Sequence, residues 1–187
     1  MPKIIEDQDV FEAVLQTIAE RGYASATTKQ MAAAAGVSEV TLFRKYMSKP
    51  LLVRLAIAAI AERADFASAV RYTGDVRADL LRVLHAYQGS VAQRGFFFVV
   101  LFSELSRHPE LSDALDVPLK LYAAVGDLLD RYQEEGILHE EHPMHAVAAL
   151  LGPLIYTSML RSAVPDDTVP PLDLDLHVTA FLHGRLI

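Results

Sequence analysis

Residues 27–50 decide the fold of the N-terminal part of the chain, and they read TTKQMAAAAGVSEVTLFRKYMSKP. Thr27 followed by Gln30 has the spacing of a capping box, which predicts the start of a short helix. Gly36 supplies a residue that can adopt the left-handed conformation of a tight turn. Ser38 is a preferred N-cap residue and predicts a second helix. The stretch therefore predicts two short helices joined by a turn at glycine.

The side chains of this stretch indicate how the two helices pack. The alanines at positions 32, 33 and 35 are small enough for another helix to approach closely. Leu42 and Tyr46 are four residues apart, so both face inward from the second helix. Val37 lies in the turn and can fill the angle between the helices. Two short helices that cross at a glycine turn form a helix-turn-helix.

Charge is distributed unevenly along the chain. The whole sequence of 187 residues has 17 basic and 24 acidic residues, a formal net charge of −7, which taken alone disfavours a nucleic-acid partner. Residues 21–49, however, hold five basic side chains and one acidic side chain, a net charge of +4. A basic segment that coincides with a helix-turn-helix is the electrostatic pattern of a DNA-binding surface.

Apolar residues recur with a helical period along most of the remaining chain. We predict helices near residues 10–22, 48–66, 76–91, 116–136, 143–160 and 175–186. The apolar run at 95–102 has a strand-like composition, but no second strand pattern is available to pair with it, so we interpret it as a buried helix. The predicted fold is all-α with about nine helices, divided into residues 1–47 and residues 48–187.

The stretch is similar to the DNA-binding region of the TetR family of transcriptional regulators. The likeness rests on Thr28, Met31-Ala32, Ala35-Gly36-Val37-Ser38, Thr41-Leu42-Phe43, Tyr46 and Ser48-Lys49 with Leu51-Leu52. In the C-terminal part the likeness is one of architecture only. The resemblance implies a three-helix DNA-binding domain with a helix-turn-helix over residues 1–47, and a ligand-binding and dimerisation domain over residues 48–187.

Positions carried over from the family imply DNA contacts along the stretch. Thr28 and Lys29 would touch phosphate or a flanking base, and Lys45 and Lys49 would anchor phosphates. Phe43 stands where the family usually has tyrosine, so a phenolic hydrogen bond to phosphate is missing. The full set of expected DNA-binding residues is Thr28, Lys29, Ser38, Glu39, Val40, Thr41, Phe43, Arg44, Lys45 and Lys49.

Glu39 is unusual on a DNA-facing helix, and two interpretations of it stay open. As a hydrogen-bond acceptor it could read the amino group of a cytosine in the major groove. The favoured interpretation is that it caps the second helix, since acidic residues belong in a first helical turn.

The two C-terminal helices predict a homodimer. The helix at 143–160 is apolar on all sides, and the last helix carries apolar residues over two faces. One face of each can pack in its own subunit while the other meets a second copy, so we expect an isologous four-helix interface. The expected interface residues are Leu150, Leu154, Met159, Val178, Phe181 and Leu182.

Aromatic residues are frequent between the predicted DNA-binding helices and these two C-terminal helices. An ordinary core is one interpretation, because aromatic side chains dominate cores. The resemblance favours a cavity for a small, largely hydrophobic ligand. The expected lining residues are Phe66, Tyr87, Phe97, Phe98, Phe102 and Tyr122.

Several other kinds of site are disfavoured. The chain has no cysteine, which excludes disulfides, thiolate metal sites and thiol nucleophiles. It has no glycine-rich phosphate loop and no Ser-His-Asp order, so we expect neither an enzyme nor a cofactor. His139, His142 and His145 lack the HExxH spacing, and a solvated loop is favoured over a divalent metal site.

The first residues do not resemble an export signal, which favours a cytoplasmic protein. The apolar window 143–160 is long enough to suggest a membrane span. Gly152 and Pro153 lie at its middle, and neither an aromatic belt nor a basic flank frames it, so we expect no membrane partner.

Together these patterns predict a dimeric transcriptional regulator that binds an operator in double-stranded DNA. We expect a repressor that a small, largely hydrophobic ligand releases from a palindromic site. The alternative is an all-α small-molecule-binding protein without a DNA function, and an activator in place of a repressor is a third possibility.

Overall fold

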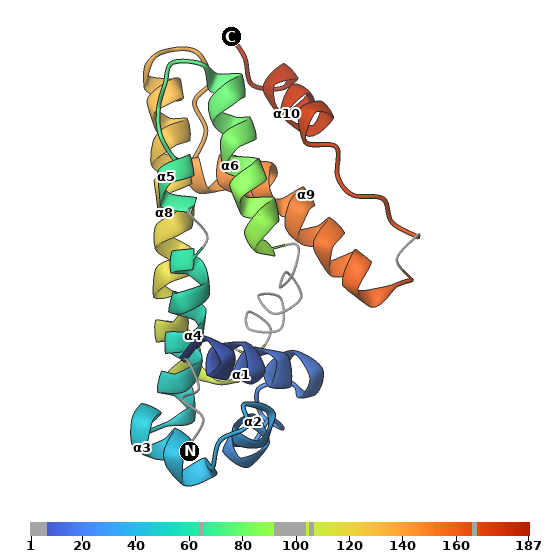
Figure 1. Cartoon of the computed structure of the whole chain (residues 1–187). Helices are drawn as coiled ribbons and strands as arrows, with labels where there is room; N and C mark the ends of the chain where they lie inside the picture. The colour runs from blue at the N-terminus through green and yellow to red at the C-terminus, as the bar shows by residue number, and fades with distance from the viewer. Residues whose placement is uncertain (1–6, 64–65, 92–103, 105–106, 166–167) are drawn as a thin grey trace. The chain divides into compact units, whose positions relative to one another are not determined.

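The computed structural model describes residues 7–63, 66–91, 104, 107–165 and 168–187 (Figure 1). Within these residues the chain is helical and contains no strand. A lone antiparallel bridge pairs Leu138 with Leu186. The prediction of an all-α fold is confirmed, and the number of helices is near the predicted nine. The predicted helix at 95–102 lies outside the described residues.

The chain divides into two compact units. Unit 1 comprises Met1–Ala61 and Phe96–Val117, and unit 2 comprises Glu62–Gly95 and Pro118–Ile187. Unit 1 contains α1 (Asp7–Arg21), α2 (Thr28–Ala34), α3 (Glu39–Tyr46), most of α4 (Lys49–Arg63) and the 3-10 helix η1 (Pro109–Leu115). Unit 2 contains α5 (Phe66–Ala69), α6 (Val76–Val91), most of α8 (Asp116–Glu134), α9 (Pro143–Ala163) and α10 (Leu174–His183).

The core of unit 1 is built from the apolar stripe of each of its helices. Helix α1 buries Val14 and Ile18, and α4 buries Leu52 and Val53. The 3-10 helix adds Leu111, whose side chain is fully buried in the same core. Burying a side chain of this size contributes about 1.5–3 kcal/mol to folding. The compact unit around the helix-turn-helix is therefore larger than the predicted domain over residues 1–47, because η1 completes its core.

The core of unit 2 joins α6, α8, α9 and α10, and α10 lies against α6 (Figure 1). Five residues that we expected at a dimer interface are buried in this core instead: Leu150, Leu154, Val178, Phe181 and Leu182. Their own chain covers them, because they lie on the stripes of α9 and α10 that face the core of unit 2. The sixth, Met159, is half-buried.

Helix α9 has the length and composition of a membrane-spanning helix over Pro143–Arg161, with a mean hydropathy of 1.3. Only 28% of this window is buried inside the structure. The buried part, which includes Val147 and Leu151, packs in the core of unit 2. One side of α9 is thus a core face, and the other side is an apolar surface.

Pro153 lies inside α9 and has no N–H group, so the carbonyl of Ala149 lacks its helical donor. The next carbonyl, that of Leu150, accepts a hydrogen bond of 2.8 Å from Nε2 of His177 on α10. This hydrogen bond connects α10 to the helical turn of α9 that contains Pro153.

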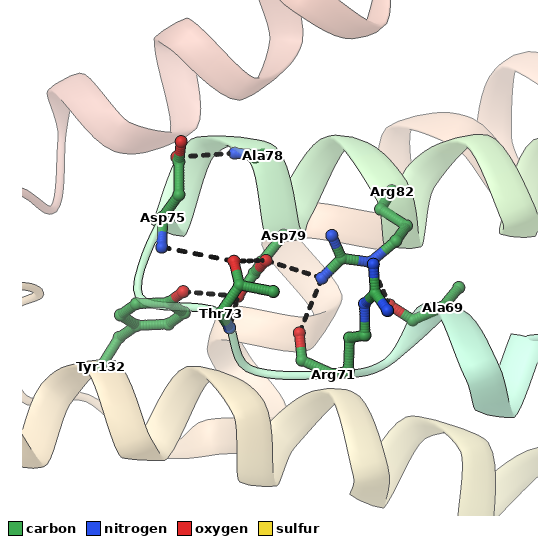
Figure 2. Close-up of polar contacts among 8 residues, drawn as sticks. All are labelled: Ala69, Arg71, Thr73, Asp75, Ala78, Asp79, Arg82 and Tyr132. Atoms are coloured by element: carbon green, nitrogen blue, oxygen red, sulfur yellow. Dashed lines mark hydrogen bonds and ion pairs between the residues drawn. The ribbon is translucent and has the colours of Figure 1, made fainter.

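A buried carboxylate fixes the segment that precedes α6 (Figure 2). The side chain of Asp79 is 0% exposed and accepts hydrogen bonds from Thr73, through both the backbone N at 2.7 Å and Oγ1 at 2.5 Å. The hydroxyl of Tyr132 on α8 donates to it at 2.6 Å, and the Arg82 guanidinium lies at 2.6 Å. We call Asp79, Thr73, Arg82 and Tyr132 the buried carboxylate network.

Arg82 extends this network to the backbone (Figure 2). Its Nε donates to the carbonyl of Ala69 at 3.0 Å, and its terminal nitrogen donates to the carbonyl of Arg71 at 2.7 Å. Burial acts to raise the pKa of Asp79, but the hydrogen bonds from Thr73, Tyr132 and Arg82 outweigh it, so the net pKa is lowered. The carboxylate is therefore charged and fully paired.

Candidate nucleic-acid interface

The N-terminal helix of the helix-turn-helix begins at the predicted capping box. The Thr27 side chain accepts from the Gln30 backbone N at 3.2 Å, and the Gln30 side chain accepts from the Thr27 backbone N at 2.9 Å. Met31 and Ala32 are buried on the inner side of α2. The capping box thus determines where α2 starts. Of the three alanines expected to pack against another helix, Ala32 and Ala35 are buried, but Ala33 is exposed.

The turn and the second helix also follow the predicted pattern. Gly36 has φ of 68°, the left-handed conformation that glycine adopts without strain. Ser38 is the N-cap of α3, and its side chain accepts from the Thr41 backbone N at 3.1 Å. Leu42 and Tyr46 are buried, as their spacing predicts.

The opposite side of α3 is exposed and mixes apolar and basic side chains. Val40 is 76% exposed and Phe43 is 60% exposed, although both are apolar. Thr41, Arg44 and Lys45 are exposed beside them. An eight-residue helix that presents these side chains outward has the character of a surface that contacts base edges and phosphates.

Glu39 makes a contact that the sequence did not predict. Its Oε1 accepts a hydrogen bond of 2.6 Å from the hydroxyl of Thr28, eleven residues earlier. The cap hydrogen bond of α3 is made by Ser38, so Glu39 does not supply it. Thr28 is the first residue of α2 and Glu39 is the first residue of α3, so their hydrogen bond joins the start of α2 to the start of α3.

Lys45, an expected phosphate anchor, is paired with Asp7 at the start of α1. The hydroxyl of Tyr46 donates to the same carboxylate oxygen at 2.9 Å. The hydrogen bond from Lys45 lowers the pKa of Asp7, desolvation opposes it, and the bond from Tyr46 lowers the pKa further. Lys45 and Asp7 are about half exposed, with side-chain exposures of 52% and 49%, so their pair is open to solvent.

Lys49, the other expected anchor, also has a partner within unit 1. Its ammonium donates to the carbonyl of Tyr23 and lies 4.0 Å from the centre of the Tyr23 ring. Burial lowers the pKa of Lys49, against the opposing fields of Glu110 and Glu104. Burial and the charge of Glu110 raise the pKa of Tyr23 to about 12. Lys49 thus holds the loop between α1 and α2 in this structure.

Lys29 and Arg44 differ from these two lysines. Both side chains are exposed, and within the described residues neither has a hydrogen bond or an ion pair. Of the four predicted cations, these two present their charge to solvent without an internal acid.

The 3-10 helix belongs to the same unit and contacts α4 through charges. Arg54 of α4 lies 3.8 Å from Asp113 and 3.8 Å from Asp116. The ring of His108 packs edge-on against Tyr23, with 4.9 Å between ring centres. The sequence carried no local signal for these contacts, because their partners are 55 or more residues apart.

Two of the predicted pocket residues are described with their side chains, and both lie in unit 2. The hydroxyls of Tyr87 on α6 and Tyr122 on α8 are 3.0 Å apart. The pKa of both hydroxyls is raised, and burial is the largest cause. Phe97, Phe98, Phe102 and the side chain of Phe66 lie outside the described residues.

The histidine cluster has a structural role at the start of α9. The Nδ1 of His142 accepts from the Met144 backbone N at 3.2 Å, so His142 caps the helix. The rings of His142 and His145 are 5.2 Å apart. In the part of the chain that the structure describes, no group of three or more potential metal ligands is found.

Two family models match the chain. The model described as bacterial regulatory proteins, tetR family, matches residues 10–56. The model described as tetracyclin repressor-like, C-terminal domain, matches residues 70–171, more than half of the chain. The first match includes the helix-turn-helix and the start of α4, and the second lies C-terminal to it.

Sequence relatives carry the same helix-turn-helix description. An uncharacterized HTH-type transcriptional regulator of Mycobacterium bovis is 31% identical over 109 residues, which cover 58% of this chain and 52% of the relative. The chain thus spans about half the length of this relative. The uncharacterized HTH-type regulator YvkB of Bacillus subtilis is 25% identical over 131 residues, 69% of this chain and 68% of that protein.

Solved structures share the fold. The fatty acid degradation regulator FadR from Bacillus halodurans has a TM-score of 0.70 at 21% identity and covers 95% of this chain and 96% of that one. The TetR family regulator PfmR from Thermus thermophilus has a TM-score of 0.66 at 20% identity, over 93% and 94% of the two chains.

Proposed function

We propose that this chain, which belongs to the TetR family of transcriptional regulators, is a dimeric repressor that a small, largely hydrophobic ligand releases from a palindromic operator. The observation that carries the proposal is the exposed face of α3. It combines two outward apolar side chains, Val40 and Phe43, with the exposed charge of Arg44 on a stretch of net charge +4. Such a face serves DNA binding and has no role in the core of unit 1.

The DNA-binding surface is proposed to use its cations in two ways. Lys29 and Arg44 have no internal partner among the described residues, so they can meet phosphates without breaking a contact. To bind a phosphate, Lys45 must break its ion pair with Asp7, and Lys49 must break its hydrogen bond to the Tyr23 carbonyl. We therefore expect Lys29 and Arg44 to contribute most of the salt-dependent affinity. Val40 and Thr41 are placed to contact base edges, where apolar groups meet the thymine methyl.

A dimer is proposed because one helix-turn-helix contacts too little DNA for tight specific binding. Leu150 and Phe181 fill the core of unit 2, so they cannot meet a partner. The outward faces of α9 and α10 carry apolar side chains that the chain leaves uncovered: Tyr156 is 59% exposed and Leu176 is 67% exposed. We propose these faces as the isologous interface in place of the buried residues.

The ligand is proposed to be largely apolar, with a polar group that meets the paired hydroxyls of Tyr87 and Tyr122. Both tyrosines have their rings turned toward the core of unit 2, and both hydroxyls are desolvated. A ligand hydroxyl or carboxyl could replace one partner of this pair at little cost in hydrogen bonds.

Release from DNA is proposed to run through η1. Because Leu111 and Leu115 fill the core around α1 and α4, a ligand that displaces η1 must repack the helices that support α3. The Arg54 contacts to Asp113 and Asp116 couple η1 to α4 in the same way. Switching further requires that the ligand bind the released state more tightly than the DNA-bound state.

The test is DNA binding across a range of salt concentrations. The full chain is titrated onto labelled DNA from upstream of its own gene that contains an inverted repeat, and anisotropy is recorded. Binding should weaken steeply with salt. Lys29→Gln should weaken binding and lower the salt slope by about two, one phosphate for each subunit of a dimer.

Lys120→Gln is the matched control, since Lys120 is an exposed lysine on α8 in unit 2. This variant should bind as the wild type does. Absent or salt-insensitive DNA binding, together with stabilisation by small apolar molecules in a thermal-shift screen, would favour the alternative of a small-molecule-binding protein without a DNA function.

A further inference from the structure

Thr28 and Glu39 form a polar pair at the surface of the helix-turn-helix. The bond of 2.6 Å runs from the Thr28 hydroxyl to Oε1 of an exposed glutamate. Ser38 already provides the side-chain cap of α3. The hydrogen bonding of α3 thus leaves the Glu39 carboxylate free for another use, while Thr28 fixes one of its two oxygens.

The number of available protons limits which DNA groups Thr28 and Glu39 can contact. A threonine hydroxyl has a single proton, and a carboxylate and a phosphate oxygen both accept hydrogen bonds. Thr28 therefore cannot donate to a DNA phosphate while it donates to Glu39. The pair presents only acceptors to DNA, and Oε2 is the oxygen that Thr28 leaves open.

The acid stands where negative charge is unfavourable. Glu39 is the only acidic residue among residues 21–49, and it lies at the first position of the outward-facing helix. Without a partner, a carboxylate in the major groove is repelled by the phosphates on both sides. DNA binding thus favours sequences that offer Glu39 a hydrogen-bond donor.

Base chemistry selects one such donor. Guanine presents acceptors, N7 and O6, and thymine presents the acceptor O4. Adenine has a donor at N6, but its acceptor N7 is adjacent and repels a carboxylate. Cytosine presents its N4 amino group with no acceptor on its own major-groove edge, and acidic side chains accept from it.

We propose that Glu39 is a specificity-determining residue that reads a cytosine in each half of the operator, and that Thr28 is the positioning residue for its carboxylate. The proposal rests on the DNA-binding function proposed above and adds one base preference to it.

The experiment selects DNA from a random-sequence pool with the full chain and sequences the bound fraction. The wild type should enrich an inverted repeat with cytosine at one fixed position of each half. Glu39→Gln should keep the repeat but lose roughly tenfold or more of the preference at that position alone, because an amide pairs equally with adenine. The Glu39→Gln variant should also bind random DNA more tightly than the wild type, because it lacks the carboxylate charge that the DNA phosphates repel.

Two further comparisons show whether Glu39 recognises a base or has only a structural role. Thr28→Val should weaken the same base preference, and Thr28→Ser, which keeps the hydroxyl, should restore it. Glu20→Gln is the charge-matched control, because Glu20 accepts a hydrogen bond from Gln16 within α1. This control should leave the preferred base unchanged.

The outcomes distinguish this proposal from the proposed function. If the wild type enriches no inverted repeat, the DNA-binding function itself fails. If an inverted repeat is enriched and Glu39→Gln shows the same preference at every position, Glu39 does not read a base and this inference is overturned. A loss of melting temperature in Glu39→Gln with unchanged base preferences would likewise leave only a structural role.

Discussion

Two aspartates of this chain have similar partners in opposite surroundings. Asp7 in unit 1 meets a lysine and the hydroxyl of Tyr46, and its side chain is 49% exposed. Asp79 in unit 2 meets an arginine, a threonine and the hydroxyl of Tyr132, and it is fully buried. In both, the net pKa of the carboxyl is lowered. The chemistry is alike, but the access of solvent differs.

Because solvent reaches Asp7 but not Asp79, the contacts of Asp7 can be exchanged for others, and those of Asp79 are permanent. Phosphate can replace Asp7 as the partner of Lys45, because both pairs are hydrated and the exposed ion pair contributes only about 0–1 kcal/mol. Asp79 is fully buried, and removal of its carboxylate would take the ion-pair partner from Arg82 and the acceptor from the buried Tyr132 hydroxyl. Unit 1 thus carries a polar contact that binding can break, and unit 2 carries one that supports the fold.

The largest expected effect is that of Asp79→Ala. This substitution should lower the free energy of unfolding by about 3–5 kcal/mol, because it removes the ion-pair partner of the partly buried Arg82 and leaves the buried Tyr132 hydroxyl without its acceptor. Chemical denaturation measures the change, with Asp7→Ala as the matched control at about 1 kcal/mol or less. Equal losses in the two variants would show that burial does not separate the two aspartates.

Acid should weaken the contribution of Asp79 to stability, because its pKa is lowered in the folded protein. A carboxyl whose pKa is lowered on folding contributes stability above its unfolded pKa of about 3.9, and this stability is lost as pH falls through the lower folded pKa. The gap in melting temperature between the wild type and Asp79→Asn should therefore be constant above about pH 5 and narrow below about pH 4. A gap that widened toward acid would contradict the lowered pKa of Asp79.

The smallest effect on stability, but an informative one for function, is expected from Asp7→Asn. The fold should lose less than about 1 kcal/mol. DNA affinity should rise about two- to fivefold at low salt, since Lys45 no longer has to leave a carboxylate. Anisotropy on the inverted-repeat DNA measures the change, and Asp9→Asn, which alters the same turn of α1, is the control. Weaker DNA binding by Asp7→Asn would show that Asp7 positions Lys45 and does not compete with DNA.

The helix-turn-helix could be predicted from the sequence because its determinants are local. The capping box of Thr27 and Gln30, the left-handed Gly36 and the Ser38 cap are each defined within four residues. The bounds of α6, Val76–Val91, follow from one apolar period. Local signals of this kind do not depend on how the rest of the chain folds.

The partners of the charged residues could not be predicted, because they are set by the tertiary fold. Lys45 meets an acid 38 residues away, and Asp79 meets a tyrosine 53 residues away. The side chains of a dimer interface were hard to predict for a related reason. A helix that is apolar on all sides gives no sign of which side its own chain covers, so the sequence does not show that Leu150 and Val178 lie in the core.

The hydrogen bond from His177 to the Leu150 carbonyl has a consequence for register. Apolar side chains on α9 and α10 would tolerate a slip of one helical turn, about 5.4 Å, with little change in the area they bury. The Leu150 carbonyl, next to the one that Pro153 leaves without a donor, accepts a hydrogen bond from the imidazole at a single axial position. One polar contact in an apolar surface thus selects one alignment of two helices from several that hydrophobic packing alone would allow.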